Sequence, residues 1–426
     1  MIVRTVWTNL AIQAMTFATS VLTARILGPV GRGELALVLL YPQLVAGIAL
    51  MGVDRAVAVL SGRGRFARPV TAIIKLAMLL SIPAMGAGYA VLTWRVADPH
   101  LSGLATIYLA YVPAVYFFTL AVYLFNGTGD FVRFNVVRLG FYVLNLIVLI
   151  SIWLVAPFAA LDWVVVANLV SVYGGLALAG WLLRGFGQSV GAQIATTKKD
   201  VRDALGLALV FALPVALANF SGSAYQIILE HQMGVRPLGL FVVYYSYSRI
   251  ISPVGGAIGS HLFQLGITGE SQNIARAFRL SLLVSFGGSL PFWLLAGWLV
   301  PLIFGPEFVV DSWVVALLFV SCPIALSSAA LAEFLNGRQK VGANTVGLVI
   351  YLAALGVIGW WLVASLGLMG MALAITVGEI VRCWYLVGQV RRETMLPIDE
   401  FWRVKRVDLA DLLRAGKRVL QGILAQ

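Results

Sequence analysis

Two stretches of sequence, TARILGPVGRGELAL at Thr23–Leu37 and LEHQMGVRPLGLFVV at Leu229–Val243, decide how this chain is organised. When they are aligned, two pairs of glycines coincide at an offset of 206 residues: Gly28 with Gly234, and Gly33 with Gly239. Three further matches keep nearly the same register: KLAMLLSI with RLSLLVSF at 204, WLVA with WLVA at 208, and Asn126-Gly127 with Asn336-Gly337 at 210. Because several matches in one register are hard to obtain by chance, the sequence predicts an internal duplication.

The composition is that of a membrane protein. The chain has 426 residues, of which 61% are hydrophobic and 11% charged, and its mean hydropathy is +0.94. A soluble domain is roughly 45–50% apolar and about 25% charged. This difference excludes soluble enzymes and nucleic-acid-binding modules, so the net charge of +12 is expected to reflect loop topology. Cys322 and Cys383 lie inside apolar runs, and we expect no disulfide, metal or cofactor site.

Apolar stretches of about 20 residues are needed to cross a bilayer as helices. We identify twelve of them, which predicts an all-α, polytopic protein with twelve transmembrane helices: 5–25, 34–58, 71–94, 103–125, 136–156, 162–183, 204–229, 239–261, 278–303, 312–335, 344–364 and 367–389. With the N-terminus in the cytoplasm, 23 of the 30 Lys and Arg residues lie on the cytoplasmic side and four on the outer side. This bias predicts that both termini are cytoplasmic.

The duplication divides the chain into a six-helix lobe over 1–203, a second over 204–390, and a tail over 391–426. Because six is even, the two lobes have the same orientation and form a parallel repeat, a plan that favours a central cavity used for alternating access. The tail alternates basic and apolar residues at helical spacing, so we expect it to lie on anionic membrane lipids.

Polar side chains inside the spans identify candidate binding residues. The first span carries Gln13 on a face with threonines and serines, and the seventh carries Asn219 and Gln226 on one face. Amides are costly in hydrocarbon unless they meet partners or water, so we expect these three to face a hydrated cavity. The hydroxyls are expected to bond their own helix backbone.

Charged residues inside the spans form a second set of candidates. Arg249 lies near the middle of the eighth span and is the strongest candidate to contact an anion, with a buried ion pair as the alternative. Arg25 and Arg55 lie near span ends, where extension toward the interface is an equal explanation. Candidate sites for a coupling ion are the acids Asp54, Glu230, Glu333 and Glu379. A local ion pair is expected between Glu379 and Arg382, whereas Asp54 and its neighbour Arg55 are expected to face different directions.

The residues also resemble a known family. ARILGP followed by GRGELAL, the segment LPVALANFSGSAYQIILEHQMGVRPLGLFVVYYSYSRIISPVGGAIG and the later FLNGRQK are similar to polysaccharide-export flippases of the Wzx type. These belong to the multidrug/oligosaccharidyl-lipid/polysaccharide (MOP) exporter superfamily. The resemblance covers about residues 5–390. It implies two six-helix lobes that form a V, as in MATE transporters, and translocation of undecaprenyl-diphosphate-linked oligosaccharide across a bacterial inner membrane.

For such a substrate, arginine suits the diphosphate because its planar guanidinium presents several N–H donors to phosphate oxygens. The sugar would lie against polar and aromatic side chains, with Tyr41 and Tyr245 joining the amides named above. Partners would be the lipid-linked oligosaccharide, membrane lipids, and the polymerase and glycosyltransferases of the same pathway, but no nucleic acid.

Several alternatives stay open. A cation-coupled multidrug antiporter of the same superfamily would bind organic cations through buried acids, which are few here. A major-facilitator transporter should carry an acid in the loop after its second span, yet the loop is SGRGRFARP. A membrane-embedded enzyme needs a large outer loop for its catalytic carboxylates, and the longest outer connection has only about ten residues. A non-transporting scaffold for polysaccharide assembly is the last alternative.

Overall fold

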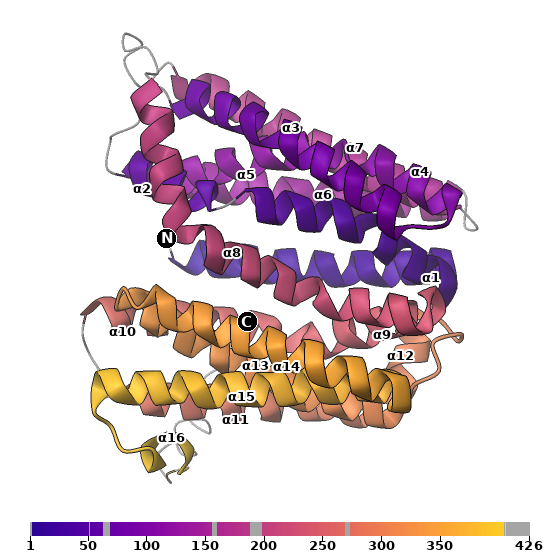
Figure 1. The fold of residues 1–426 in the computed structure, drawn as a ribbon, viewed down its shortest axis with the longest axis vertical. Coiled ribbons are helices and arrows are strands. Elements are labelled where there is room, and N and C mark those ends of the chain that lie inside the picture. Colours follow the sequence, from indigo (N-terminus) through magenta and orange to yellow (C-terminus); the bar gives the residue numbers. More distant parts are fainter. Residues whose placement is uncertain are drawn as a thin grey trace, which may run out of the picture. The chain divides into compact units, whose positions relative to one another are not determined.

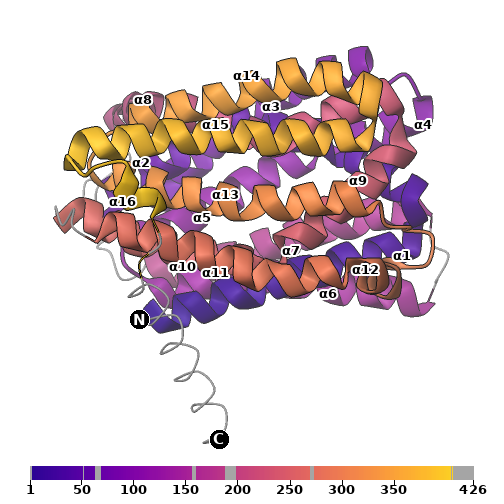
Figure 2. The same ribbon diagram turned by 90° about the horizontal axis from the view of Figure 1, so that it is seen from below.

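A computed structural model describes residues 2–50, 52–62, 69–155, 160–187, 198–268, 273–403 and 405, and these residues form helices without strands. Each of the twelve predicted spans coincides with helix in this part of the chain (Figures 1 and 2). The fold class predicted from the sequence is therefore confirmed. By length and hydropathy, nine helical segments of the described residues could each cross a membrane. The first, Trp7–Ala49, is 43 residues long and covers most of the predicted spans 5–25 and 34–58, the second of which continues into α2.

The first half of the chain contains seven helices: α1 (Ile2–Ala49), α2 (Val53–Gly62), α3 (Pro69–Arg95), α4 (Pro99–Tyr108), α5 (Tyr111–Gly127), α6 (Phe131–Val155) and α7 (Leu161–Gly187). Within α1 the chain kinks at Gly28, whose φ of 65° and ψ of −175° are not helical. α4 and α5 together form the fourth span, and Asp98 caps its start by accepting hydrogen bonds from the backbone N–H groups of His100 and Leu101.

The second half repeats this order: α8 (Lys198–Met233), α9 (Val235–Ser248), η1 (Arg249–Ile251), α10 (Ser252–Thr268), α11 (Ile274–Leu294), α12 (Ala296–Phe304), α13 (Ser312–Gly337), α14 (Val341–Leu366), α15 (Leu368–Thr394) and the short α16 (Asp399–Trp402). The eighth span is broken at the 3₁₀ turn η1. Pro253 lies two residues after that turn and has no N–H to continue an α-helical ladder, which accounts for the break.

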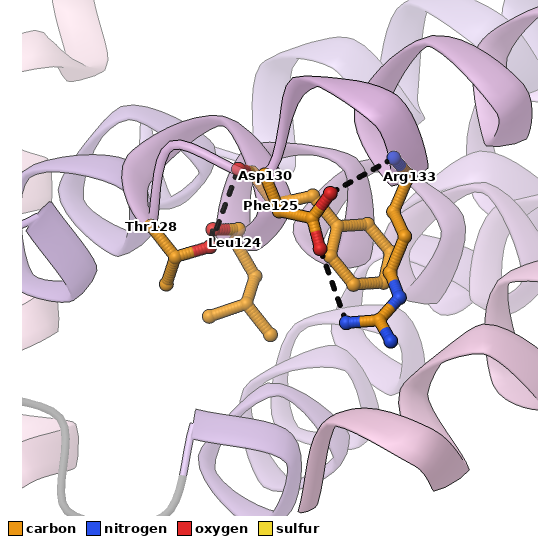
Figure 3. A network of polar contacts seen from close by, with 5 residues as sticks. All are labelled: Leu124, Phe125, Thr128, Asp130 and Arg133. Carbon is orange, nitrogen blue, oxygen red and sulfur yellow. Dashed lines mark hydrogen bonds and ion pairs between the residues drawn. The ribbon is translucent and has the colours of Figure 1, made fainter. Parts of the chain in front are cut away.

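The local geometry of the two halves supports the duplication. After α5, Asp130 N donates to Phe125 O at 2.9 Å across a turn in which Gly129 has a φ of 78°. Figure 3 shows the Asp130 carboxylate at the end of this turn, where it accepts hydrogen bonds from Arg133. After α13, Lys340 N donates to Leu335 O at 2.8 Å, and Gln339 has a φ of 62°. Both hydrogen bonds join residues related by the offset of 210, so the repeated Asn-Gly dipeptides open the same turn twice.

The same close packing occurs in each half, through a glycine of α5 in the first half and a glycine of α10 in the second. A Cβ on Gly127 would lie 2.2 Å from Ala58 O, so α5 touches the backbone of α2 there. A Cβ on Gly266 would lie 2.4 Å from Phe334 O and 3.1 Å from the Cα of Gly337, which makes the corresponding contact between α10 and α13. Glycine is required in both places because the neighbouring atoms belong to the backbone and cannot rotate away.

The described residues belong to two compact units. The first comprises Met1–Val243 with Pro301–Phe308, and the second Tyr244–Val300 with Val309–Gln426. In the first unit α8 packs against α1 and α2, and α6 against α7 and α1; in the second α13 packs against α10, α11 and α15. The repeat boundary between 203 and 204 describes the duplication rather than this packing, and it stays a prediction.

Exposed tryptophans mark the helix ends in both units. Trp94 at the end of α3 is 80% exposed, and Trp361 near the end of α14 is 75% exposed. Tryptophan at the ends of apolar helices is typical of the membrane–water interface.

After α15 the chain folds back onto the second unit. The Phe401 side chain of α16 is fully buried against Phe278 of α11, while the buried Arg279 donates to the backbone carbonyl of Glu400. Lys405 Nζ lies 2.6 Å from Glu400 Oε2. The basic amphipathic helix is predicted over 391–426. The described part of that range contains the end of α15 and the short α16, whereas residues 404 and 406–426 lie outside the described part of the chain.

Candidate functional site: a polar cavity in the first unit

A cavity of about 360 Å³ lies inside the first unit, between α1, α2, α5 and α8. Its volume falls within the range of roughly 300–1,000 Å³ that is usual for small-molecule sites. The polar and aromatic residues that line it are Gln43, Asp54, Arg55, Tyr111, Tyr116, Thr119, Tyr123 and Asn219. Three of them, Asp54, Arg55 and Asn219, are residues that the sequence singles out.

The break between α1 and α2 places Asp54 and Arg55 at this cavity. Gly52 has a φ of 72°, and a Cβ there would lie 2.5 Å from the Cβ of Phe211 in α8. A glycine is needed at this position both for the positive φ and for the close approach of α8. Because α2 begins one residue later, its first turn carries the acid and the arginine to the cavity wall.

Asp54 and Arg55 interact, which corrects the expectation that they face different ways. Arg55 Nε lies 3.9 Å from Asp54 Oδ2, because the long arginine side chain folds back toward its neighbour. The Asp54 side chain is 8% exposed and that of Arg55 is 56% exposed. Asp54 Oδ1 is buried and has no hydrogen-bond partner among the described residues, so a polar group of a ligand would have a buried acceptor here.

The opposite walls supply aromatic and amide groups. The ring centroid of Tyr123 lies 5.2 Å from the Arg55 guanidinium carbon, a cation–π distance. On α8, Asn219 Nδ2 donates to Gly47 O at 3.0 Å. A Cβ on Gly47 would lie 2.8 Å from that nitrogen, so the glycine is what lets the amide reach across to α1. The site thus combines one guanidinium, one carboxylate, two amides and several phenol rings.

A second group of the predicted residues meets elsewhere in the first unit. Arg95 Nε donates to Tyr41 Oη at 3.4 Å, and Glu230 lies close enough to Arg95 to interact with it electrostatically. Tyr41 is buried and Glu230 is half-buried. The structure therefore gives Glu230 a cationic neighbour that the sequence analysis does not anticipate.

Arg249 belongs to a charged cluster in the second unit. One of its Nη atoms lies 2.5 Å from Tyr245 Oη, and its guanidinium carbon lies 4.8 Å from the centroid of the same ring. Glu379 of α15 interacts electrostatically with both Arg249 and Arg382. Arg382 Nη1 lies 3.6 Å from Glu379 Oε2, which confirms the local ion pair expected on that helix. The cluster has two guanidiniums and one carboxylate, so it is cationic when Glu379 is ionised.

The remaining predicted residues lie apart from these groups. Arg25 donates two hydrogen bonds to the last carbonyls of α12, those of Leu302 and Ile303, which is how arginines often cap a helix C-terminus. Gln226 Nε2 donates to the Tyr225 hydroxyl at 3.3 Å. Gln13 is half-buried on α1, and Glu333 of α13 packs beside Gly259. As expected for the hydroxyls of the first span, those of Thr16 and Thr23 bond the backbone of their own helix.

The sequence analysis missed several cavity residues for which signals exist. Gln43 occupies the position of Arg249 in the first repeat, because the two are separated by the same offset of 206. On α5, Tyr116, Thr119 and Tyr123 follow one another at spacings of three and four, so they share one helix face. Either pattern could have identified the cavity wall before the structure was known.

No family model matches the sequence, and no curated protein matches it either. Solved structures do match over nearly the whole chain. The lipid II flippase MurJ in an inward closed conformation has a TM-score of 0.72 at 12% identity, with 97% of this chain and 92% of that chain covered.

Two MATE structures are also similar. An inward-facing multidrug resistance MATE family transporter of the MOP superfamily has a TM-score of 0.64 at 17% identity, covering 91% of this chain and 94% of that one. The eukaryotic MATE transporter AtDTX14 has a TM-score of 0.66 at 16% identity, covering 92% and 96%. Likeness at this level of identity concerns the fold. The chain is a multi-pass membrane protein with the fold shared by MATE transporters of the MOP superfamily and the MurJ flippase.

Proposed function

We propose that the protein is a flippase that moves polyprenyl-diphosphate-linked oligosaccharides across a bacterial inner membrane by alternating access. The observation that carries this proposal is the cavity of the first unit, which holds Arg55 beside the amides of Gln43 and Asn219 and the tyrosines of α5. A sugar diphosphate leaves water only where donors and acceptors replace its hydration. Arginine offers a planar fork of donors to phosphate, and amides and phenols suit hydroxyl-rich sugars.

Arg249 is the second cationic candidate in this proposal. It lies at the broken turn of the eighth span and stacks on Tyr245, within a cluster that has more cationic than acidic groups. A buried cluster of this charge favours an anionic substrate over an organic cation. The MurJ structure supports the general idea, because that protein of the same fold is named as a flippase of a lipid-linked molecule.

The proposed setting follows from the same argument. Both termini would face the cytoplasm, where the basic tail would bind anionic lipids. The functional partners would be the glycosyltransferases that build the lipid-linked oligosaccharide on the cytoplasmic side and the polymerase that consumes it on the other.

The test is a translocation assay in proteoliposomes that contain a fluorescently labelled polyprenyl-diphosphate oligosaccharide. A membrane-impermeant quencher added outside should bleach nearly all of the label when the wild-type protein is present and about half in empty vesicles. Arg55→Gln and Arg249→Ala should each slow the loss of the protected half, whereas Arg184→Gln, which removes an exposed arginine at the end of α7, should not.

Two results would overturn the proposal. If the wild-type protein leaves half of the label protected, it does not move this substrate. If instead it exports an organic cation such as ethidium in response to a proton or sodium gradient, it is a multidrug antiporter of the same superfamily.

A further inference from the structure

A second cavity, of about 260 Å³, adjoins the first along α5. Tyr111, Val115, Thr119 and Tyr123 line both cavities, so α5 forms their common wall. The remaining lining differs in character. The second cavity is closed by Phe118, Val122, Phe141, Tyr142 and Val172 together with one charged residue, Arg138 of α6. A polar cavity and an apolar one therefore lie side by side within the first unit.

Two arginines flank the shared wall. Arg55 lines the polar cavity and Arg138 the apolar one, and both interact electrostatically with Tyr123. The Arg138 guanidinium carbon lies 4.8 Å from the centroid of Phe134, and one Nη donates to Asn9 Oδ1 at 3.0 Å. Within the described part of the chain this is its only hydrogen bond, and no carboxylate there forms an ion pair with it.

This arrangement leaves unused binding capacity for an anion. A guanidinium has five N–H donors, and Arg138 uses one of them among the described residues. Asp54 is the carboxylate that approaches Arg55, at 3.9 Å, so the pair of arginines carries an excess positive charge. Arg138 is half-buried and has no ion-pair partner among the described carboxylates. Such an arginine is costly in an apolar setting, which is why residues of this kind usually mark a substrate path.

We infer that the first unit binds a polyprenyl diphosphate with its diphosphate between Arg55 and Arg138, its first isoprene units in the apolar cavity, and its sugar in the polar cavity. The inference rests on the proposed function and specifies where the substrate lies. A molecule with a polar head, a doubly charged link and an apolar chain matches the order of the two cavities and the arginines between them. A cavity of about 150 Å³ can hold a benzene molecule, so one of about 260 Å³ accommodates one or two five-carbon units.

Two soluble probes separate the parts of this site: geranyl diphosphate, which carries two isoprene units, and inorganic diphosphate, which carries none. Binding of each to the purified full-length protein in detergent can be measured by thermophoresis. Geranyl diphosphate should bind about tenfold or more tightly than inorganic diphosphate, because only it fills the apolar cavity. Arg138→Gln should weaken both probes about tenfold, while Arg184→Gln should weaken neither.

The apolar cavity has its own matched pair of variants on α7. Val172 is 3% exposed and lines the cavity, whereas Val170 is 47% exposed. Val172→Phe should bring the affinity for geranyl diphosphate close to that for inorganic diphosphate, and Val170→Phe should leave the ratio unchanged. If Val172→Phe does not give a monodisperse protein, Val122→Phe on α5 fills the same cavity and replaces it.

The placement is overturned if the cavity-filling variants keep the wild-type ratio, or if Arg138→Gln binds inorganic diphosphate as tightly as the wild type does. A protein that translocates the oligosaccharide but shows either result refutes the placement and leaves the proposed function intact. A protein that gives the expected binding but translocates no lipid-linked oligosaccharide refutes the proposed function alone.

Discussion

Gly33→Ala tests whether the two glycine-containing stretches that define the repeat meet in the folded protein. A Cβ on Gly33 would lie 1.7 Å from Val235 O, and one on Gly239 would lie 1.9 Å from Pro29 O. The backbones of α1 and α9 therefore touch at these two glycines, both within the first unit. Real Cβ atoms essentially never approach another heavy atom closer than 3.0 Å, so the alanine must move α1 and α9 apart by about 1.3 Å.

The displacement gives the direction and size of the effect. Overpacking costs about 1–3 kcal/mol, and the obstructing atom is a backbone carbonyl that cannot rotate away. Replacing a helical glycine returns about 0.5–1 kcal/mol through reduced backbone entropy. Because the obstructing carbonyl is rigid, we expect the overpacking to outweigh this gain, so that Gly33→Ala loses up to about 2 kcal/mol of stability.

Gly103→Ala is the matched control, because a Cβ on that exposed glycine of α4 meets nothing within 4 Å. It should be neutral or stabilising. Thermal unfolding of both variants in detergent, followed by tryptophan fluorescence, provides the comparison. A melting temperature for Gly33→Ala equal to or above that of Gly103→Ala would show that α1 and α9 do not touch at these glycines.

Three further changes test other parts of the structure. Asp130→Ala removes the carboxylate that accepts a hydrogen bond from Arg133 N at 3.1 Å at the start of α6, and it should lower thermal stability by about 1 kcal/mol. Lys340→Ala changes the repeated position at the start of α14, where no side-chain cap exists, and it should cost less. Phe401→Ala removes a fully buried ring worth about 1.5–3 kcal/mol, so trypsin should cleave after Arg403 about tenfold to a hundredfold faster, and an unchanged cleavage rate would contradict the docking of α16. The hydrogen bond from Lys405 holds the pKa of Glu400 below its ordinary value, so this contact should stabilise α16 fully above about pH 4.3 and lose its effect as the pH falls through the lowered pKa. Hydrogen exchange of α16 should show this loss in the wild type and not in Glu400→Gln.

The repeat shows which local features can be predicted from a single sequence. The offset of 206 found in the quoted stretches correctly pairs Gly28 with Gly234, and both have positive φ values, of 65° and 82°. The offset of 210 correctly pairs the Asn-Gly turns. These features are local, since a turn depends on a few neighbouring residues and a span depends on the hydropathy of about 20. The same reasoning explains why every predicted span coincides with helix.

Only part of the candidate site could be predicted from the sequence. Asp54, Arg55 and Asn219 were identified because polar groups are rare in apolar helices, and the structure gathers them around one cavity. Arg138 was not among the residues identified from the sequence, and its place beside the apolar cavity follows from the packing of α6 against α5 and α7. Helical spacing predicts which side chains share one face of a helix, but not which other helix packs against that face.

The sequence by itself thus determined that the protein crosses the membrane repeatedly and that its two halves are copies, because each of these depends on composition or on short-range geometry. Only the tertiary structure decided which polar residues meet. It brought Glu379 of α15 to Arg249, which has no acid on its own span, and it placed two arginines on either side of Tyr123. Such contacts join residues far apart in the chain, and they depend on how whole helices pack.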